Sequence, residues 1–265
     1  MSFQVQEYFP GVWHIRDAMG VCMTLLAGDR EAVLIDAGYG LEPVRPLIAS
    51  LTDKPCRLIL THGHHDHALG AMGLDRVWLH PDDLPVYRTY TARAQRQAVL
   101  ASAAEKGVRT DAADYLTALM PEPEAETGEA LELGGLTAEI MPCPGHTPGS
   151  LVVYVPEYRL LLTGDDWNPT TWLFFPEALS VADYLKNLRA LLADCPFEHA
   201  LCPHRTALYG REAVEAFLSG LTPECLHRAA PSPEGQAKGV RTGRAVPAPG
   251  QELVFDLDKY MEKKT

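Results

Sequence analysis

The sequence has no long apolar run and no export signal. No segment approaches the roughly 18 to 20 consecutive apolar residues that a membrane-spanning helix requires. The N-terminal segment MSFQVQEYFPG also lacks a basic region followed by an apolar stretch. We therefore expect a cytoplasmic protein that does not bind membranes.

The chain has fewer basic than acidic residues. The chain has 23 lysines and arginines against 35 aspartates and glutamates, which gives a formal net charge of −12. Proteins that bind a phosphate backbone depend on basic surface and on counterion release. The charge balance therefore argues against a nucleic-acid partner. We expect a small-molecule substrate, and the sequence leaves a homodimer open.

Paired cysteine motifs are missing as well. The six cysteines are scattered, and no C-x-x-C pair is present. This absence argues against a zinc knuckle and against a dithiol redox site. We interpret most of the cysteines as reduced thiols in the core.

The rest of the composition is that of an ordinary globular protein. The 265 residues are 46% hydrophobic and 22% charged, enough to bury a sizeable core. Because α/β folds of this length often form one unit, we predict a single domain over residues 1–265.

The first third of the chain alternates between strand and helix patterns. Residues 21–37 predict two short strands around a turn at 28–30, and a helix is expected from about 43 to 50. Apolar runs at 57–61 and 77–79 predict two further strands. Strands that alternate with helices indicate an α/β fold.

The pattern then changes to helical. Residues 82–120 are rich in alanine and show no strand signal, which predicts a helical insertion between strands. A second β-rich half follows, with expected strands at 131–156, 159–163 and 200–202 and a helix at 181–192. The Pro-, Gly- and Ala-rich segment 229–250 predicts an exposed loop, and residues 252–257 predict a final edge strand.

The densest group of chemically active side chains follows the strand at 57–61. The segment THGHHDH at 61–67 holds four histidines and a carboxylate. Side chains alternate in an extended segment, so His62 and His64 point the same way. If Asp66 opens a helix, Asp66 and His67 project from its first turn toward the same space. Imidazole nitrogen and carboxylate oxygen suit zinc, and suit iron or manganese with less preference.

Three later positions carry the same kinds of side chain. The turn PCPGHTPG at 142–149 holds His146, Asp165 follows the strand at 159–163, and His204 follows the strand at 200–202. A lone H-x-H motif is more often an adventitious surface site. These positions lie at strand ends or in tight loops, on the side of an α/β sheet where ligands bind, and they favour a built metal site.

The combined pattern resembles the metallo-β-lactamase superfamily. The resemblance rests on H-x-H-x-D-H at 62–67, the G-H-T-P-G turn around His146, and then Asp165 and His204 in the family's order. It implies a four-layer αβ/βα sandwich with a two-metal site at one edge of the two sheets. It assigns one metal to His62, His64 and His146, the other to Asp66, His67 and His204, a bridging role to Asp165, and the orientation of a ligand to Asp36.

The implied cofactors are two divalent metal ions, with zinc preferred over iron or manganese. Two such ions about 3.5–4 Å apart share a water and lower its pKa from 15.7 towards neutrality, so a metal-bridging hydroxide would act as nucleophile. Asp66 is the expected catalytic residue, because it would pass a proton to the leaving group.

The resemblance favours hydrolysis of a small ester, thioester or lactone. True β-lactamases replace part of the ligand set with cysteine or lack the bridging aspartate, whereas Asp165 is retained here. The pattern is more similar to glyoxalase II and lactonases, although the long insertion between His67 and His146 departs from glyoxalase II. Two alternatives stay open: a phosphodiesterase on the same fold, and a mononuclear iron oxygenase of the sulfur-dioxygenase kind.

An aromatic segment follows Asp165. Residues 167–175 include four aromatic side chains, for which core packing is the default interpretation. The segment leaves directly from a predicted ligand, so a wall of the substrate pocket is the alternative, and we select Trp167 and Trp172 as candidate substrate contacts. Arg205 and Tyr209 are candidate hydrogen-bond donors to substrate, but nothing in the sequence orients them.

Overall fold

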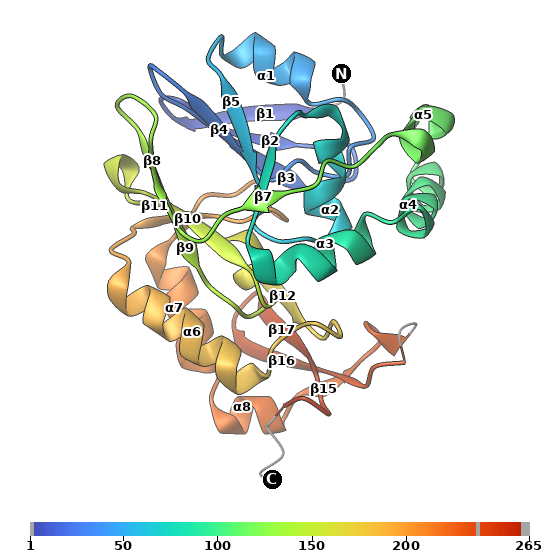
Figure 1. Ribbon diagram of the computed structural model, residues 1–265. Helices are drawn as coiled ribbons and strands as arrows, with labels where there is room; N and C mark the ends of the chain where they lie inside the picture. The colour runs from blue at the N-terminus through green and yellow to red at the C-terminus, as the bar shows by residue number, and fades with distance from the viewer. Residues whose placement is uncertain (1–2, 237–238, 261–265) are drawn as a thin grey trace.

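The computed structural model describes residues 3–236 and 239–260. Two large β-sheets stack against each other, and helices cover their outer faces (Figure 1). None of the helices in the described ranges combines the length and the apolar character that crossing a membrane requires.

The first sheet is built from the N-terminal half of the chain. Its seven strands follow one another in sequence order: β1 (Gln4–Phe9), β2 (Val12–Arg16), β3 (Cys22–Ala27), β4 (Ala32–Ile35), β5 (Cys56–Ile59), β6 (Val77–Leu79) and β7 (Glu124–Ala125). Strands β1 to β4 pair antiparallel and β4 to β7 parallel. Helix α1 (Arg45–Leu51) joins β4 to β5, and β5 leads into α2 (His65–Ala68) and η1 (Leu69–Gly73). The strands and the helix expected in this region are confirmed, whereas β1 and β2 were not predicted.

The second sheet comes from the later part of the chain. Its order is β14-β13-β11-β10-β9-β8. The strands are β8 (Ala130–Glu132), β9 (Thr137–Pro142), β10 (Leu151–Val155), β11 (Leu160–Leu162), β13 (His199–Leu201) and β14 (Tyr209–Gly210). The helical elements of this half are η3 (Pro156–Tyr158), η4 (Gly164–Asp166), α6 (Val181–Asp194), α7 (Arg211–Gly220) and α8 (Pro223–His227).

Alternating side chains divide the core into layers. In β4, Val33 faces the core between the two sheets, whereas Leu34 packs in the cluster that includes Leu47 of α1. In β10, Val153 faces the inter-sheet core and Val152 packs with residues of α6 and α7. Each strand thus buries both faces, as the period of two requires. The predicted four-layer α/β sandwich is confirmed.

A third sheet corrects the prediction for the C-terminal region. Its order is β12-β17-β16-β15, with β12 (Thr170–Leu173), β15 (Ala230–Ser232), β16 (Thr242–Ala248) and β17 (Gln251–Asp256). Strand β17 lies between β12 and β16, so it is not an edge strand. Part of the predicted loop at 229–250 is strand, because pairing with β17 satisfies the backbone despite an unfavourable composition. Residues 237–238 of that predicted loop lie outside the described residues.

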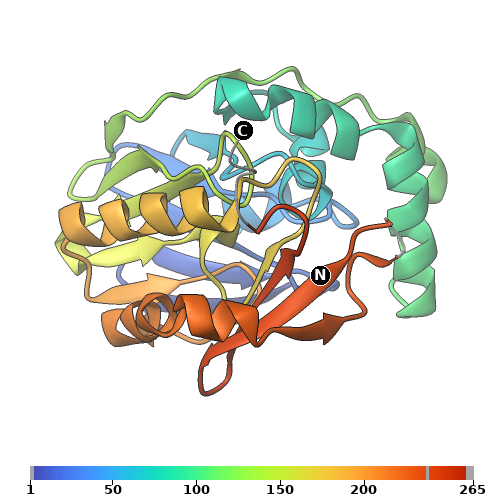
Figure 2. The same ribbon diagram turned by 90° about the horizontal axis from the view of Figure 1, so that it is seen from below.

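The insertion between β6 and β7 is helical, as predicted. It contains η2 (Pro81–Asp83), α3 (Leu84–Tyr90), α4 (Arg93–Glu105) and α5 (Ala112–Thr117). Val99 and Tyr115 pack with Leu41 and Leu69, which lie in the loop after β4 and in η1. In Figure 2, α4 lies on the side of the molecule opposite α6 and α7.

Candidate metal centre

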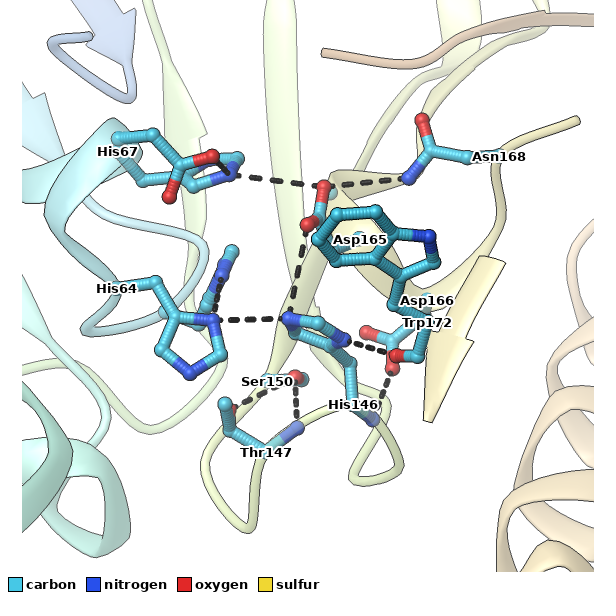
Figure 3. Close-up of polar contacts among 12 residues, drawn as sticks. His64, His67, His146, Thr147, Ser150, Asp165, Asp166, Asn168 and Trp172 are labelled. Atoms are coloured by element: carbon cyan, nitrogen blue, oxygen red, sulfur yellow. Dashed lines mark hydrogen bonds and ion pairs between the residues drawn. The ribbon is translucent and has the colours of Figure 1, made fainter. Parts of the chain in front are cut away.

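All seven predicted ligands come together at one edge of the two sheets. Figure 3 labels His64, His67, His146 and Asp165 among them. They belong to five segments: the loop after β5, helix α2, the turn between β9 and β10, η4 after β11, and the loop after β13. Three overlapping groups could each hold a metal ion: His62, His64 and His146; His62, His67 and Asp165; and Asp66, His67 and His204. In each group the ligand atoms lie within 4.8 Å of one another.

The first group consists of three buried imidazoles. His64 Nδ1 lies 3.1 Å from His62 Nε2 and 2.9 Å from His146 Nε2. Tetrahedral zinc with metal–nitrogen bonds of about 2.0–2.1 Å separates its ligands by about 3.3 Å. Both separations from His64 Nδ1 are therefore close to the spacing that a tetrahedral metal ion requires.

The outer nitrogens of two of these rings face groups that only accept hydrogen bonds. His64 Nε2 lies 2.6 Å from Glu177 Oε1, and His146 Nδ1 lies 2.7 Å from the carbonyl oxygen of Trp172. Burial opposes ionisation of Glu177, but the hydrogen bond that it accepts from His64 lowers its pKa to about 2. Burial lowers the pKa of His64 to about 4, so its ring is neutral at neutral pH. Both outer nitrogens then donate, and the inner nitrogens have lone pairs.

His62 reaches the same state through a hydroxyl. Its Nδ1 lies 3.1 Å from Thr61 Oγ1, and that hydroxyl donates its one proton to the Asp36 carboxylate. His62 Nδ1 must therefore donate, which leaves a lone pair on Nε2. Three lone pairs converge on one point, and their mutual repulsion is relieved by a cation between them. The residues therefore fit a metal ion.

Asp66, His67 and His204, which we call the second group from here on, carry more charge than the three imidazoles of the first group. His67 Nε2 and His204 Nε2 lie 3.7 and 3.8 Å from Asp66 Oδ2. His67 Nε2 is buried and has no hydrogen-bond partner among the described residues. Burial disfavours the charged form of His67, but the carboxylates of Asp36, Asp66 and Asp165 outweigh it and raise its pKa well above the usual value. This surrounding stabilises positive charge, which a bound metal would supply in place of the proton.

Asp165 lies between the two groups. Its Oδ2 is 3.5 Å from His146 Nε2, and its Oδ1 is 3.6 Å from His67 Nε2 and 3.1 Å from His204 Nε2. Burial disfavours its ionised form, but the charges of His204 and His67 hold its pKa well below the usual range. The side-chain amide of Asn168 donates to Oδ1 at 3.2 Å.

Asp36 orients His67. Its Oδ2 accepts a hydrogen bond from His67 Nδ1 at 2.8 Å, and its Oδ1 accepts one from the backbone N–H of Thr61 at 2.8 Å. The residue has a φ of 62°, in the left-handed region that side chains other than glycine rarely adopt. This conformation turns the carboxylate at the end of β4 toward the metal loop. A strained backbone held by several hydrogen bonds is common at functional sites.

A second carboxylate joins the two histidine loops. Asp83 is fully buried, and it accepts hydrogen bonds from Gly63 N at 2.5 Å and Gly149 N at 3.0 Å. Both positions need glycine, because a Cβ on Gly63 would collide with the backbone of Tyr87 and one on Gly149 would lie 2.7 Å from Asp83 N. The insertion therefore anchors the loops that carry His62, His64 and His146.

The sequence pattern did not identify three polar residues of this centre: Glu177, Asp83 and Asn168. Glu177 is 113 residues from its partner His64, and no motif connects the two. Asp83 stands beside an exposed aspartate in the pair Asp82-Asp83, so the sequence does not distinguish them. Asn168 is three residues beyond Asp165, and this spacing is the one signal that could have identified it.

A cavity of about 590 Å³ opens onto the ligands. Besides His64, Asp66, Asp165 and His204, its lining includes Tyr39, Tyr90, Asn168, Thr170, Trp172, Phe174, Phe175, Arg205 and Glu234. Trp172 thus borders this cavity, with 42% of its surface exposed.

Trp167 does not line the cavity. Its ring is fully buried in the core and packs edge-on against Tyr209 at 5.2 Å between ring centroids. Neither Trp167 nor Tyr209 lines the cavity, so we do not propose either of them as a substrate contact. The two tryptophans are separated because Trp167 precedes β12 and faces the helices α6 and α7, whereas Trp172 lies in β12 on its exposed face.

Comparisons with known proteins agree with this geometry. Residues 17–165 match the family model of the metallo-β-lactamase superfamily. Acyl-coenzyme A thioesterase MBLAC2 of Bos taurus is 26% identical over 213 residues, which cover 72% of this chain and 74% of that relative. Hydroxyacylglutathione hydrolase GloC of Haemophilus influenzae is 28% identical over 151 residues, which cover 54% of this chain and 65% of the relative.

Among solved structures, the sec-alkylsulfatase Pisa1 from Pseudomonas sp. superposes with a TM-score of 0.62 at 18% identity. The match covers 82% of this chain and 40% of the sulfatase chain, so this chain spans less than half of that enzyme. At this identity the likeness concerns the fold alone. With the family model spanning more than half of the sequence and the ligand cluster at the sheet edge, the chain belongs to the metallo-β-lactamase superfamily and is a metal-dependent hydrolase.

Proposed function

We propose that the chain hydrolyses small thioesters, esters or lactones with two divalent metal ions, zinc in preference to iron or manganese. The observation that carries the proposal is the position of Asp165: its Oδ2 faces His146, its Oδ1 faces His67, and His204 Nε2 lies 3.1 Å from Oδ1 and 3.2 Å from Oδ2. A carboxylate with both oxygens engaged is suited to bridge a pair of ions.

Individual side chains of the site have separate roles in this reaction. When bound, a pair of divalent ions lowers the pKa of a shared water and so supplies hydroxide at neutral pH. Asp165 fixes the separation of the two ligand groups, and Asn168 holds Asp165. Asp66 borders the cavity, and we assign its carboxylate the proton that the attacking water releases.

The bond changes of thioester hydrolysis balance with these groups. The oxygen of water bonds to the carbonyl carbon, the carbon–sulfur bond breaks, and its electron pair leaves with the sulfur. The proton held on Asp66 then moves to that sulfur, so the products are an acid and a thiol. Both curated relatives support the thioester over the ester and the lactone, since an acyl-coenzyme A thioesterase and a hydroxyacylglutathione hydrolase are thioester hydrolases by name.

The test is a metal analysis combined with a substrate screen. The protein purified without chelator should contain two metal ions per chain, and it should hydrolyse at least one of a panel of thioesters, simple esters and lactones in a chelator-sensitive reaction. One iron per chain with oxygen consumption would instead indicate the sulfur-dioxygenase kind of enzyme. Turnover of phosphodiesters alone would indicate a phosphodiesterase.

A further inference from the structure

We infer that the site discriminates between the two halves of a thioester: it takes an uncharged, apolar acyl group beside His64 and His146, and an anionic thiol carrier beside His204. This inference rests on the proposed function and adds the substrate class. It follows from the unequal chemistry of the two ends of the cavity.

The end beside His64 and His146 is aromatic. The Phe175 ring lies 4.6 Å from the His64 ring and 5.4 Å from the His146 ring, measured between centroids. Phe174 stacks on Phe175 at 4.8 Å, and Trp172 continues the surface at 5.2 Å from Phe174. We call these three residues the aromatic wall. Trp172 is exposed, Phe175 is partly buried and Phe174 is buried, and an aromatic surface of this kind beside the predicted metal ligands favours an apolar group.

Tyr90 borders the cavity beside the aromatic wall. Its ring lies 4.4 Å from the His64 ring and 6.4 Å from Phe175. Tyr90 belongs to α3 of the insertion, whereas the wall belongs to β12 and the loop that follows it. An acyl group at this end of the cavity therefore meets aromatic carbon from both segments.

The surroundings of this end oppose an acidic acyl group. Glu177 accepts a hydrogen bond from His64 at 2.6 Å beside the wall, and Glu234 borders the cavity. Glu234 is already paired with Arg244 at 2.6 Å. Apart from Arg205 beside His204, the described residues that line the cavity include no lysine or arginine, so a carboxylate on the acyl group would lie unpaired beside aromatic carbon, which is costly.

The end beside His204 carries the positive charge. Arg205 is the only lysine or arginine among the described residues that line the cavity. Its backbone oxygen accepts a hydrogen bond from the buried His14 Nε2 at 3.1 Å, and its side chain is exposed, with one N–H donated to His204 O at 2.8 Å. The guanidinium has further donors directed to solvent. A phosphate-bearing thiol carrier that leaves over His204 would meet this group.

The experiment compares four thioesters with the metal-loaded wild-type protein. Acetyl-, butyryl- and succinyl-coenzyme A differ only in the acyl group, and butyryl-N-acetylcysteamine replaces the anionic carrier by a neutral one. We expect kcat/KM for butyryl-coenzyme A to exceed that for the acetyl thioester by about 100-fold, since each of its two extra methylenes contributes roughly 10-fold in an apolar pocket, and to exceed that for the succinyl thioester by about 10-fold or more.

Substitutions at Trp172 and Arg205 test which end of the cavity determines the acyl preference and which determines the carrier preference. Trp172→Ala should lower kcat/KM for butyryl-coenzyme A about 10-fold, mainly through KM, and change the acetyl ester by less than about 2-fold. Trp172→Phe should restore most of the loss. Arg205→Gln should raise KM for the coenzyme A esters about 3- to 10-fold and leave the N-acetylcysteamine ester unchanged. Leu119→Ala and Arg88→Gln, which alter exposed side chains outside the cavity, are the matched controls.

The outcomes separate the two proposals. If wild type turns over thioesters but prefers succinyl over butyryl, or if Trp172→Ala affects acetyl and butyryl esters equally, the acyl assignment is wrong. If Arg205→Gln raises KM equally for the coenzyme A and N-acetylcysteamine thioesters, the assignment of an anionic carrier to the end beside His204 is wrong. If the metal-loaded wild type hydrolyses none of the four thioesters, the proposed thioesterase function fails and this inference fails with it.

Discussion

Glu177 Oε1 lies 2.6 Å from His64 Nε2, on the far side of the imidazole from the nitrogen that faces His62 and His146. This contact fixes both the tautomer and the orientation of His64. Such outer partners of metal-binding histidines commonly change metal affinity about 10- to 100-fold when they are removed.

Glu177→Ala should therefore weaken metal binding at the first group by about 10- to 100-fold. The buried His64 Nε2–H loses its acceptor, and the ring is free to turn. Glu177→Gln should recover part of the affinity, because its amide oxygen still accepts this hydrogen bond. Competition with a chromophoric chelator measures the affinity, and Glu122→Ala, at an exposed position paired with Arg88, is the control. Wild-type affinity in Glu177→Ala would refute the orienting role.

His146→Ala should reduce metal content and hydrolytic rate together, each by at least about 10-fold at limiting metal. The change deletes one of three nitrogens of the first group, while the turn around it is held by Asp83 and by the His146 N–H bond to Asp166 at 3.1 Å. The fold should survive, as checked by circular dichroism. His227→Ala, at an exposed histidine remote from the cluster, should change neither quantity. Full metal content and full rate in His146→Ala would contradict the ligand assignment.

Asp165→Asn should damage activity far more than folding. A neutral amide bridges two cations poorly, so we expect the rate to fall about 100-fold or more and the second metal to bind weakly. The measurements are turnover at saturating metal, metal content and thermal unfolding of the metal-free protein. Unchanged turnover with two metals bound would remove the bridging role of Asp165.

Asp83→Ala should lower the free energy of unfolding by about 2–4 kcal/mol, because it leaves the N–H groups of Gly63 and Gly149 without their acceptor in a buried place. Metal affinity should fall as well, since both histidine loops lose a shared anchor. Urea unfolding of the metal-free variant separates the two effects. Asp82→Ala changes the exposed neighbour and should leave stability within about 0.5 kcal/mol of wild type. Equal stabilities of the two variants would exclude the anchoring role.

Acidification should remove metal from the second group first. His67 and His204 have raised pKa values, because nearby carboxylates outweigh their burial, so a metal must displace their protons at mildly acidic pH. His64, with a pKa lowered to about 4 by burial, is already neutral there. Affinity at the second group therefore rises with pH over a range where His64 is already neutral.

Dialysis at about pH 8 and about pH 5.5 tests this, with metal per chain as the readout. We expect the metal content of the wild type to fall from two ions per chain at the higher pH to one at the lower pH. The variant His204→Ala should hold one ion per chain at both pH values. In the metal-free protein the raised His67 pKa stabilises the fold below its usual value of 6.5, and that contribution is lost as pH rises through the folded-state pKa. Simultaneous loss of both ions on acidification would contradict the difference between the two groups.

The sequence by itself determined the parts of the fold and the site that short-range spacing controls. Apolar runs specify β4, β5 and β10 because side chains alternate along a strand. His62, His64, Asp66 and His67 form a recognisable pattern because they share one strand-to-helix junction of six residues. Resemblance to a known family then supplied the later ligands in their order.

The tertiary structure determined the features that depend on which surfaces pack against each other. Glu177 reaches His64 across 113 residues, and Asp83 rather than Asp82 is turned inward. Trp167 is buried while Trp172 is exposed, since burial depends on which layer covers each ring. Likewise, β16 became a strand through its pairing with β17, although its composition favours a loop. Long-range packing selects among local alternatives of similar free energy, and local composition does not contain that information.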